Sequence, residues 1–223
     1  MSKDWTGNNA SLYRIMGASN HSDTEREEDD FYATDPKAID ALAEKWQIPN
    51  TILEPACGSG HLAIRLEQLG HHVIATDKVD RGYGDVRDFF SYTTMPEGCE
   101  CIITNPPYKF ATEFVEHSLR LLPEGGWCAM FVKTTFLEGQ KRFKAIFSHH
   151  PPLLVLQFVQ RIKCAKNGDF AAISGSAVAY CWIVWQKAYN GPTTLDWINY
   201  NNDNKSSIAG DPAGTKPTKS NEK

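Results

Sequence analysis

The sequence lacks the features of a membrane protein or a secreted protein. None of its apolar runs reaches the about 18 residues that a membrane-spanning helix needs. Its first twenty residues do not combine a basic start, an apolar stretch and a small-residue cleavage site, so we expect no secretion and a cytoplasmic location. The six cysteines are spread along a chain that is long enough to form a core without disulfides, and we expect reduced thiols.

The chain also lacks an excess of positive charge. Its 23 Lys and Arg against 27 Asp and Glu give a net charge of −4, which argues against a protein that coats nucleic acid through bulk charge. The charges are unevenly distributed, because residues 21–30 hold six acids and one arginine whereas residues 139–168 hold six basic residues and no acid. These runs are interpreted either as a local basic surface on an acidic protein or as two solvated segments.

Composition divides the chain into one domain with two polar ends. Residues 1–30 form a polar and acidic segment, and residues 190–223 are nearly free of large apolar residues after Tyr200, which predicts a largely disordered tail. The length and the absence of internal repeats favour a single folded domain over residues 31–189.

Within this domain, short apolar runs alternate with segments of helical period. The predicted strands are 51–54, 72–76, 83–86, 100–104, 127–132, 153–159 and 176–185, and the predicted helices are 36–46, 61–69, 109–122 and 139–148. This alternation predicts an α/β fold, doubly wound, with a mainly parallel seven-stranded sheet and helices on both faces. Ligands of such sheets bind beyond the carboxyl ends of the strands.

A glycine turn joins the first of these strands to the next helix. In Glu54–His61 (EPACGSGH), Gly58 and Gly60 allow the backbone to approach a ligand closely. Asp77, 17 residues after Gly60 at the end of the second strand, is placed to bind ribose hydroxyls. A nucleoside cofactor is the natural interpretation, but the spacing Gly58-x-Gly60-x-x-Ala63 also fits a dinucleotide, and a glycine turn alone can simply pack a helix on a strand.

A second motif follows the strand at 100–104. Asn105-Pro106-Pro107-Tyr108 stands at the same carboxyl edge, and its prolines fix an extended backbone that is poor in donors. Asn105 offers a side-chain carbonyl, Pro106 a main-chain carbonyl, and Tyr108 a flat face for stacking. The motif therefore predicts a site for a planar substrate with an NH₂ group.

These motifs, in this order, resemble those of S-adenosylmethionine-dependent amino methyltransferases. Glu54–His61 is similar to their cofactor motif, and Asn105–Tyr108 to the NPPY motif of enzymes that most often methylate N6 of adenine in DNA. Residues 31–36 (FYATDP) resemble the segment in which gamma-class DNA adenine methyltransferases bind the methionine end of the cofactor. The resemblance covers residues 31–187 and implies the Rossmann-like class I methyltransferase fold, a catalytic domain over 31–189 and S-adenosylmethionine as the cofactor.

The resemblance also implies roles for single residues at the cofactor. It assigns Thr34 to the cofactor carboxylate, Asp77 to the ribose and Asp88 to the adenine amine. The other cofactor-binding positions that it implies are Tyr32, Glu54, Pro55, Ala56, Cys57, Gly58, Gly60, Lys78, Phe89 and Asn105.

For the reaction, the resemblance implies Asn105, Pro106, Pro107 and Tyr108 as catalytic residues. Asn105 and Pro106 would accept the hydrogens of the adenine amine, and Tyr108 would stack on a flipped or single-stranded base, without a covalent intermediate. The substrate-binding positions expected besides Tyr108 are Lys133, Phe170, Lys141, Arg142, Arg161 and Lys163.

The sequence departs from gamma-class enzymes in having no room for a large target-recognition domain. Only 36 mostly polar residues follow Lys187. We expect DNA as the partner, with recognition through short loops and the basic segment 139–168, through a homodimer or through a separate recognition subunit. The same chemistry on RNA adenine or on a protein glutamine would also suit the NPPY turn. More remotely, the glycine turn by itself would fit an NAD-binding oxidoreductase or an idle nucleotide-binding module.

No metal site is expected. Cys99 and Cys101 form a lone CxC pair, and the His71-His72 and His149-His150 pairs lack the spacing of a ligand set.

Overall fold

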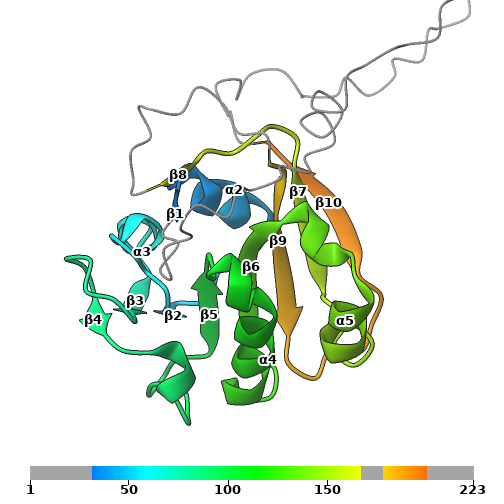
Figure 1. Cartoon of the computed structure of the whole chain (residues 1–223), viewed down its shortest axis with the longest axis horizontal. Coiled ribbons are helices and arrows are strands. Elements are labelled where there is room, and N and C mark those ends of the chain that lie inside the picture. The colour runs from blue at the N-terminus through cyan, green and yellow to red at the C-terminus, as the bar shows by residue number, and fades with distance from the viewer. Residues whose placement is uncertain (1–31, 167–177, 200–223) are drawn as a thin grey trace, which may run out of the picture.

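An eight-stranded sheet forms the centre of the protein. The computed structural model describes residues 32–166 and 178–199 (Figure 1). The strands of this sheet are β2 (Thr51–Glu54), β3 (His72–Asp77), β4 (Asp85–Val86), β5 (Cys101–Thr104), β6 (Trp127–Lys133), β7 (Leu154–Phe158), β9 (Tyr180–Gln186) and β10 (Thr194–Ile198). Their order is β10-β7-β9-β6-β5-β2-β3-β4, and every neighbouring pair is parallel except those of β9, which runs antiparallel to both β6 and β7.

Two helices cover each face of the sheet. On one face, α2 (Lys37–Lys45) and α3 (His61–Gln68) contribute Ile39, Leu42, Leu62 and Leu66 to a buried cluster. On the other face, α4 (Ala111–Leu121) and a helical segment that begins with α5 (Gln140–Arg142) and continues as a π-helix (Phe143–Phe147) bury a second cluster with Val115, Leu119 and Ile146. Short 3₁₀ turns lie at Phe89–Ser91, Tyr108–Phe110 and Thr134–Leu137. The predicted doubly wound, mainly parallel α/β fold is confirmed. The predicted number of seven strands is wrong, because β10 (Thr194–Ile198) adds an eighth strand to the sheet.

The strand β10 corrects the predicted boundary of the tail. The sequence places disorder from residue 190, whereas Thr194–Ile198 pairs in parallel with β7, and Ile198 is buried. Asp196 also forms an ion pair with Lys45 of α2, with its oxygen 2.8 Å from the lysine Nζ. This strand has only five residues, two of them polar, and is too short to be recognised in sequence. Residues 1–31 and 200–223, which include most of both predicted ends, lie outside the described residues.

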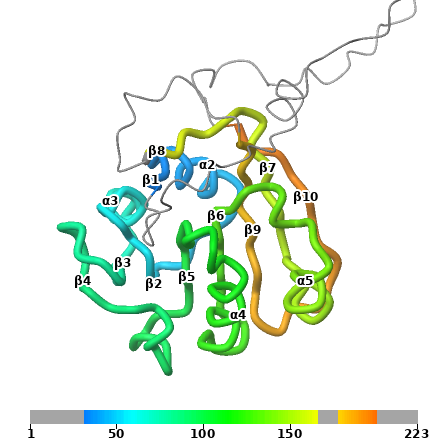
Figure 2. Tube along the Cα trace, viewed as in Figure 1, coloured from blue at the N-terminus to red at the C-terminus, as the bar shows by residue number. Residues whose placement is uncertain are grey.

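A small second sheet covers the carboxyl edge of the large one. It pairs β1 (Tyr32–Thr34) with β8 (Cys164–Lys166) in antiparallel fashion, with Thr34 opposite Cys164. In the tube view, β1 and β8 lie beyond the ends of β5 and β6 (Figure 2). The sheet therefore brings residues 32–34 above the motifs that follow β2 and β5.

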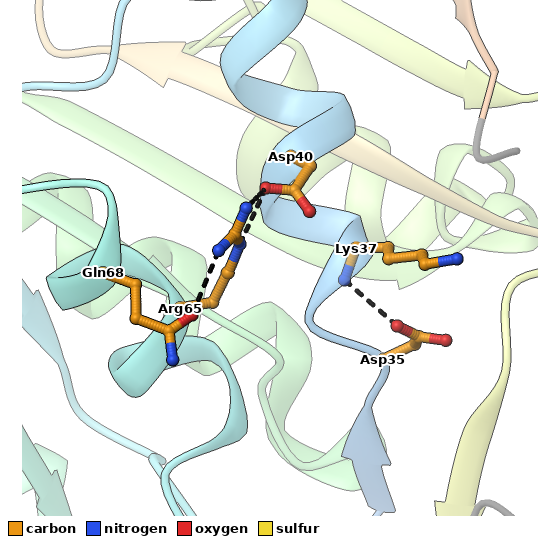
Figure 3. A network of polar contacts seen from close by, with 5 residues as sticks. All are labelled: Asp35, Lys37, Asp40, Arg65 and Gln68. Carbon is orange, nitrogen blue, oxygen red and sulfur yellow. Dashed lines mark hydrogen bonds and ion pairs between the residues drawn. The ribbon is translucent and has the colours of Figure 1, made fainter. Parts of the chain in front are cut away.

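Charged side chains fix α2 against α3. Arg65 of α3 donates from Nε to Asp40 of α2 at 2.8 Å and from Nη1 to Gln68 at 3.0 Å (Figure 3). Asp35 accepts the main-chain N–H of Lys37 at 3.1 Å as the chain enters α2. Because α2 follows β1 directly, these bonds also hold β1 in place above the sheet.

Among the described residues, none of the helices has both the length and the apolar character to cross a bilayer.

Candidate functional site

A cavity of about 350 Å³ opens between β1 and the carboxyl ends of β2, β3 and β5. This volume lies within the range of small-molecule sites. Most of the residues that the sequence singles out line it: Tyr32, Thr34, Glu54, Pro55, Ala56, Cys57, Asp77, Lys78, Asp88, Phe89, Asn105, Pro106, Pro107 and Tyr108. Segments from four strands thus meet in one place, as expected for a doubly wound sheet.

The turn after β2 depends on its glycines. Gly58 and Gly60 have φ of 55° and 82°, in the left-handed region that favours glycine. A Cβ on Gly60 would come within 2.5 Å of the Tyr83 ring. These two residues do not belong to the cavity lining, so their contribution is to let the chain turn sharply beneath it.

Asp77 ties this turn to the end of β3. One carboxylate oxygen accepts the N–H of Gly58 at 2.9 Å, and the other accepts the N–H of Val79 at 2.9 Å. A carboxylate has about four acceptor positions, so each oxygen can accept a further hydrogen bond from a ligand hydroxyl in the cavity.

Glu54 is a buried acid in the cavity wall. It is 1% exposed, and its Oε2 has no hydrogen-bond partner among the described residues. Burial, and secondarily the charge of Asp77, raise the pKa of Glu54 from 4.5 to about 8, although a hydrogen bond from the main chain of Ala63 acts the other way. Near neutral pH, the free protein therefore holds Glu54 mainly protonated, ready to ionise beside a cation.

Glu54 should make the stability of the protein depend on pH. Because the pKa is about 8 in the fold and 4.5 when unfolded, the native state binds the extra proton between these values and loses stability as pH rises through this window. Glu54→Gln removes this titration. We therefore compare the melting temperatures of the two proteins by thermal unfolding. The value for Glu54→Gln minus the value for the wild type should become larger by several degrees between pH 5 and pH 8. A constant difference across this range would contradict the raised pKa.

Asp88 and Phe89 form the other end of the cavity. Asp88 Oδ1 accepts the N–H of Phe90 at 2.9 Å, and its Oδ2 lies 3.7 Å from the Nζ of Lys78. Phe89 is buried, with its ring centroid 4.7 Å from that of Phe114. This end combines an acceptor with aromatic walls, which suits a flat heterocycle that carries an amine.

The amide of Asn105 is held in one orientation. Its Nδ2 donates to the carbonyl of Tyr32 at 3.2 Å and to Oγ1 of Thr34 at 2.9 Å. Its Oδ1 is buried and has no hydrogen-bond partner within the described part of the chain. Since both donors of the amide are used by β1, the oxygen is the group that remains to accept hydrogen from a ligand.

Tyr108 is fixed by its neighbours. Its ring centroid lies 5.6 Å from that of Tyr32, and its hydroxyl lies 2.7 Å from the hydroxyl of Tyr180. The Nζ of Lys133, at the end of β6, stands 4.2 Å from the centroid of the same ring. Lys133 is outside the cavity lining but adjoins it through Tyr108.

The structure places the other basic candidates away from the cavity lining. Arg142 is held by main-chain carbonyls, donating to Phe136 at 2.7 Å, to Thr135 at 3.0 Å and to Glu138. These bonds give Arg142 a structural role that its sequence position did not reveal. Lys141 and Arg161 are exposed and Lys163 is half-buried, whereas Phe170 lies outside the described residues.

Sequence reasoning missed several residues of the cavity wall: Ala33, His61, Leu62, Val79, Arg81, Phe90, Phe110 and Phe114. His61 directly follows the glycine turn, and its burial lowers its pKa. The aromatic pair Phe89-Phe90 and the phenylalanine two residues after Tyr108 are signals that could have extended the predicted site.

Within the described residues, no group of three or more His, Cys, Asp or Glu side chains is arranged to hold a metal ion.

No protein-family model matches the sequence, and no curated protein matches it by sequence. Solved structures do match it. A protein of Listeria monocytogenes described as a class I S-adenosylmethionine-dependent methyltransferase aligns with a TM-score of 0.51 and 16% identity, over 85% of this chain and 71% of the other. A type I restriction-modification system methyltransferase subunit from Streptococcus thermophilus gives 0.54 and 14% identity, over 76% and 47%. A modification subunit of a type I restriction enzyme from Vibrio vulnificus gives 0.51 and 14%, over 88% and 51%.

The similarity to these structures identifies the fold. The chain has the Rossmann-like fold of class I methyltransferases, as the motifs led us to expect. It spans about half the length of the two restriction-modification subunits.

Proposed function

We propose that this protein is an S-adenosylmethionine-dependent methyltransferase that acts on N6 of adenine in DNA. The observation that carries the proposal is Asn105, whose amide is oriented by β1. Its buried oxygen, which has no partner among the described residues, is left in a cavity beside Tyr108. That oxygen is a suitable acceptor for an exocyclic amine. The remainder of the cavity offers the groups that a nucleoside cofactor requires.

The residues of the cavity fit S-adenosylmethionine. This cofactor carries a ribose diol, an adenine amine, an ammonium and a sulfonium. Asp77 would hold the ribose and Asp88 the adenine amine, next to the buried ring of Phe89. Glu54 would face the positive charge, since its Oε2 is buried without a partner among the described residues and its pKa falls when a cation is near.

Most of the catalysis in this proposal comes from the positioning of the substrate amine. The cofactor, when bound, supplies a methyl group on a positively charged sulfur. Asn105 Oδ1 and the carbonyl of Pro106 accept the two hydrogens of the substrate amine and hold its nitrogen in one orientation. Tyr108 offers an aromatic face to the base, which replaces the stacking lost when a base leaves its helix. Asn105 Oδ1 is buried, and this burial strengthens the hydrogen bond that it accepts.

DNA is the substrate that we favour for two reasons. An NPPY turn is typical of enzymes that methylate amines of DNA bases. In addition, two solved structures with this fold are described as methyltransferase or modification subunits of type I restriction systems. Because those proteins are described as subunits, we propose that a partner subunit or a second copy contributes to the recognition of a target sequence.

The proposal is tested by incubating the full chain with S-adenosylmethionine that carries a labelled methyl group. Duplex DNA, single-stranded DNA, RNA and a glutamine-containing peptide are offered in parallel. We expect label in DNA, and more of it in single-stranded DNA because no base must be flipped out of a duplex. Label in RNA or peptide alone would overturn the proposed substrate. Binding of NADH without binding of S-adenosylhomocysteine, measured by calorimetry, would overturn the proposed cofactor.

A further inference from the structure

Tyr180 lies outside the motifs and outside the cavity lining, yet it contacts the aromatic residue of the NPPY turn. From this contact we infer that Tyr180 is a positioning residue, which holds the Tyr108 ring at the angle where a planar substrate stacks on it. The inference rests on the proposed function, because it concerns the same substrate site.

Tyr180 is itself buried and held by several contacts. It begins β9, where it stands opposite Lys133 of β6, and it is 5% exposed. Its ring stacks on that of Phe131 with centroids 4.9 Å apart and planes at 15°. Its carbonyl also accepts a hydrogen bond from Gln157 at 3.1 Å. A residue packed and bonded in this way can serve as a fixed point for a neighbour.

Tyr108, by contrast, lies on a short 3₁₀ turn at Tyr108–Phe110 that follows the two prolines. The hydroxyl bond to Tyr180, at 2.7 Å, fixes the far end of its ring, and the two rings are tilted by 30°. Without that bond, the ring could rotate toward Tyr32 or Lys133, both of which already contact it. The hydroxyl pair therefore determines which way the face of Tyr108 points.

The bond persists over the whole range of assay pH. Burial is the main cause that raises the pKa of both phenols, so neither ionises in neutral solution. Cys164 of β8 also contacts both hydroxyls. Cys164 stands opposite Thr34 of β1, whose hydroxyl accepts a hydrogen bond from Asn105. Both functional side chains of the NPPY turn are thus held by strands far away in sequence, Asn105 by β1 and Tyr108 by β9.

The test uses Tyr180→Phe, which keeps the ring and removes the hydroxyl. We expect kcat for methyl transfer to DNA to fall about 10-fold, while the dissociation constant of S-adenosylhomocysteine stays unchanged. The matched control is Tyr189→Phe, which removes a hydroxyl bonded to the carbonyl of Pro192 beyond β9 and should leave kcat unchanged. A kcat of Tyr180→Phe equal to that of the wild type would overturn the inference.

A double variant separates positioning from stability. In Tyr180→Phe, the hydroxyl of Tyr108 loses its phenol partner, whereas Tyr108→Phe/Tyr180→Phe has neither hydroxyl, so its melting temperature should recover toward that of the wild type. We expect its kcat to remain low, because the ring is still unanchored. A kcat that recovers together with the melting temperature would contradict positioning.

Ring orientation can also be measured without turnover. Single-stranded DNA with 2-aminopurine at the target adenine changes its fluorescence when the base stacks on Tyr108, and Tyr180→Phe should reduce that change. If the wild type transfers no methyl group, the proposed function fails. The fluorescence then decides the inference on its own, and equal changes in the wild type and the variant would overturn it.

Discussion

Asn105→Ala is expected to remove most methyl transfer, with kcat reduced about 100- to 1,000-fold, which is the scale seen when one group that stabilises a transition state is removed. The variant lacks the only side-chain acceptor that the NPPY turn offers to the substrate amine. Affinity for S-adenosylhomocysteine, measured by calorimetry, should change by less than about threefold, because the groups proposed for ribose and adenine are untouched.

The control for this variant is Asn190→Ala, which removes an exposed amide outside the cavity lining. Asn105→Ala also frees the carbonyl of Tyr32 and the hydroxyl of Thr34, so its melting temperature should be compared with that of the control. Turnover by a folded Asn105→Ala protein at the wild-type rate would rule out the role assigned to this amide.

Asp77→Ala is expected to weaken cofactor binding about 100-fold, which corresponds to the loss of one or two charge-assisted hydrogen bonds. The effect has two sources. A partner of the ribose is lost, and the N–H groups of Gly58 and Val79 lose their acceptor, so the glycine turn is no longer tied to β3. Titration calorimetry with S-adenosylhomocysteine measures the change.

Asp80→Ala provides a close control. Asp80 is exposed, three residues further along, and its carboxylate accepts the N–H of Gly82 at 2.9 Å without lining the cavity. This substitution removes an acid and a local turn bond but should leave the dissociation constant unchanged. Equal effects of the two substitutions would show that a general loss of charge, and not the position of Asp77, weakens binding.

The larger elements were predictable because their patterns are local. β6 and β9 each contain a run of six apolar residues, and α4 repeats apolar residues at helical spacing. The strands that were missed, β1, β8 and β10, have three to five residues each. They exist because of their partners: Thr34 lies opposite Cys164, and Leu195 opposite Val155. Such pairing depends on the tertiary structure, which a short window of sequence does not contain.

The site was predictable to a similar extent and for a similar reason. Glu54 and Asp77 are the last residues of parallel strands and Asn105 directly follows one, so their convergence at one edge follows from the fold class. The hydrogen bonds that hold the side chains of the site in place were not predictable from the sequence. The bonds from Asn105 to Tyr32 and Thr34 span 73 and 71 residues, and the bond from Tyr108 to Tyr180 spans 72. The aromatic wall of Phe90, Phe110 and Phe114 likewise arises only when the turn at Phe89–Ser91 packs against the start of α4.

The most direct test of the central claim is the identity of the methylated product. Wild-type protein would be incubated with labelled S-adenosylmethionine and adenine-containing DNA, the DNA digested to nucleosides, and the labelled nucleoside separated and weighed by mass spectrometry. The geometry at Asn105 and Tyr108 predicts N6-methyldeoxyadenosine, with the label absent when Asn105→Ala replaces the wild type. Label on cytosine or on a carbon or oxygen atom, or label that persists in Asn105→Ala, would contradict the account.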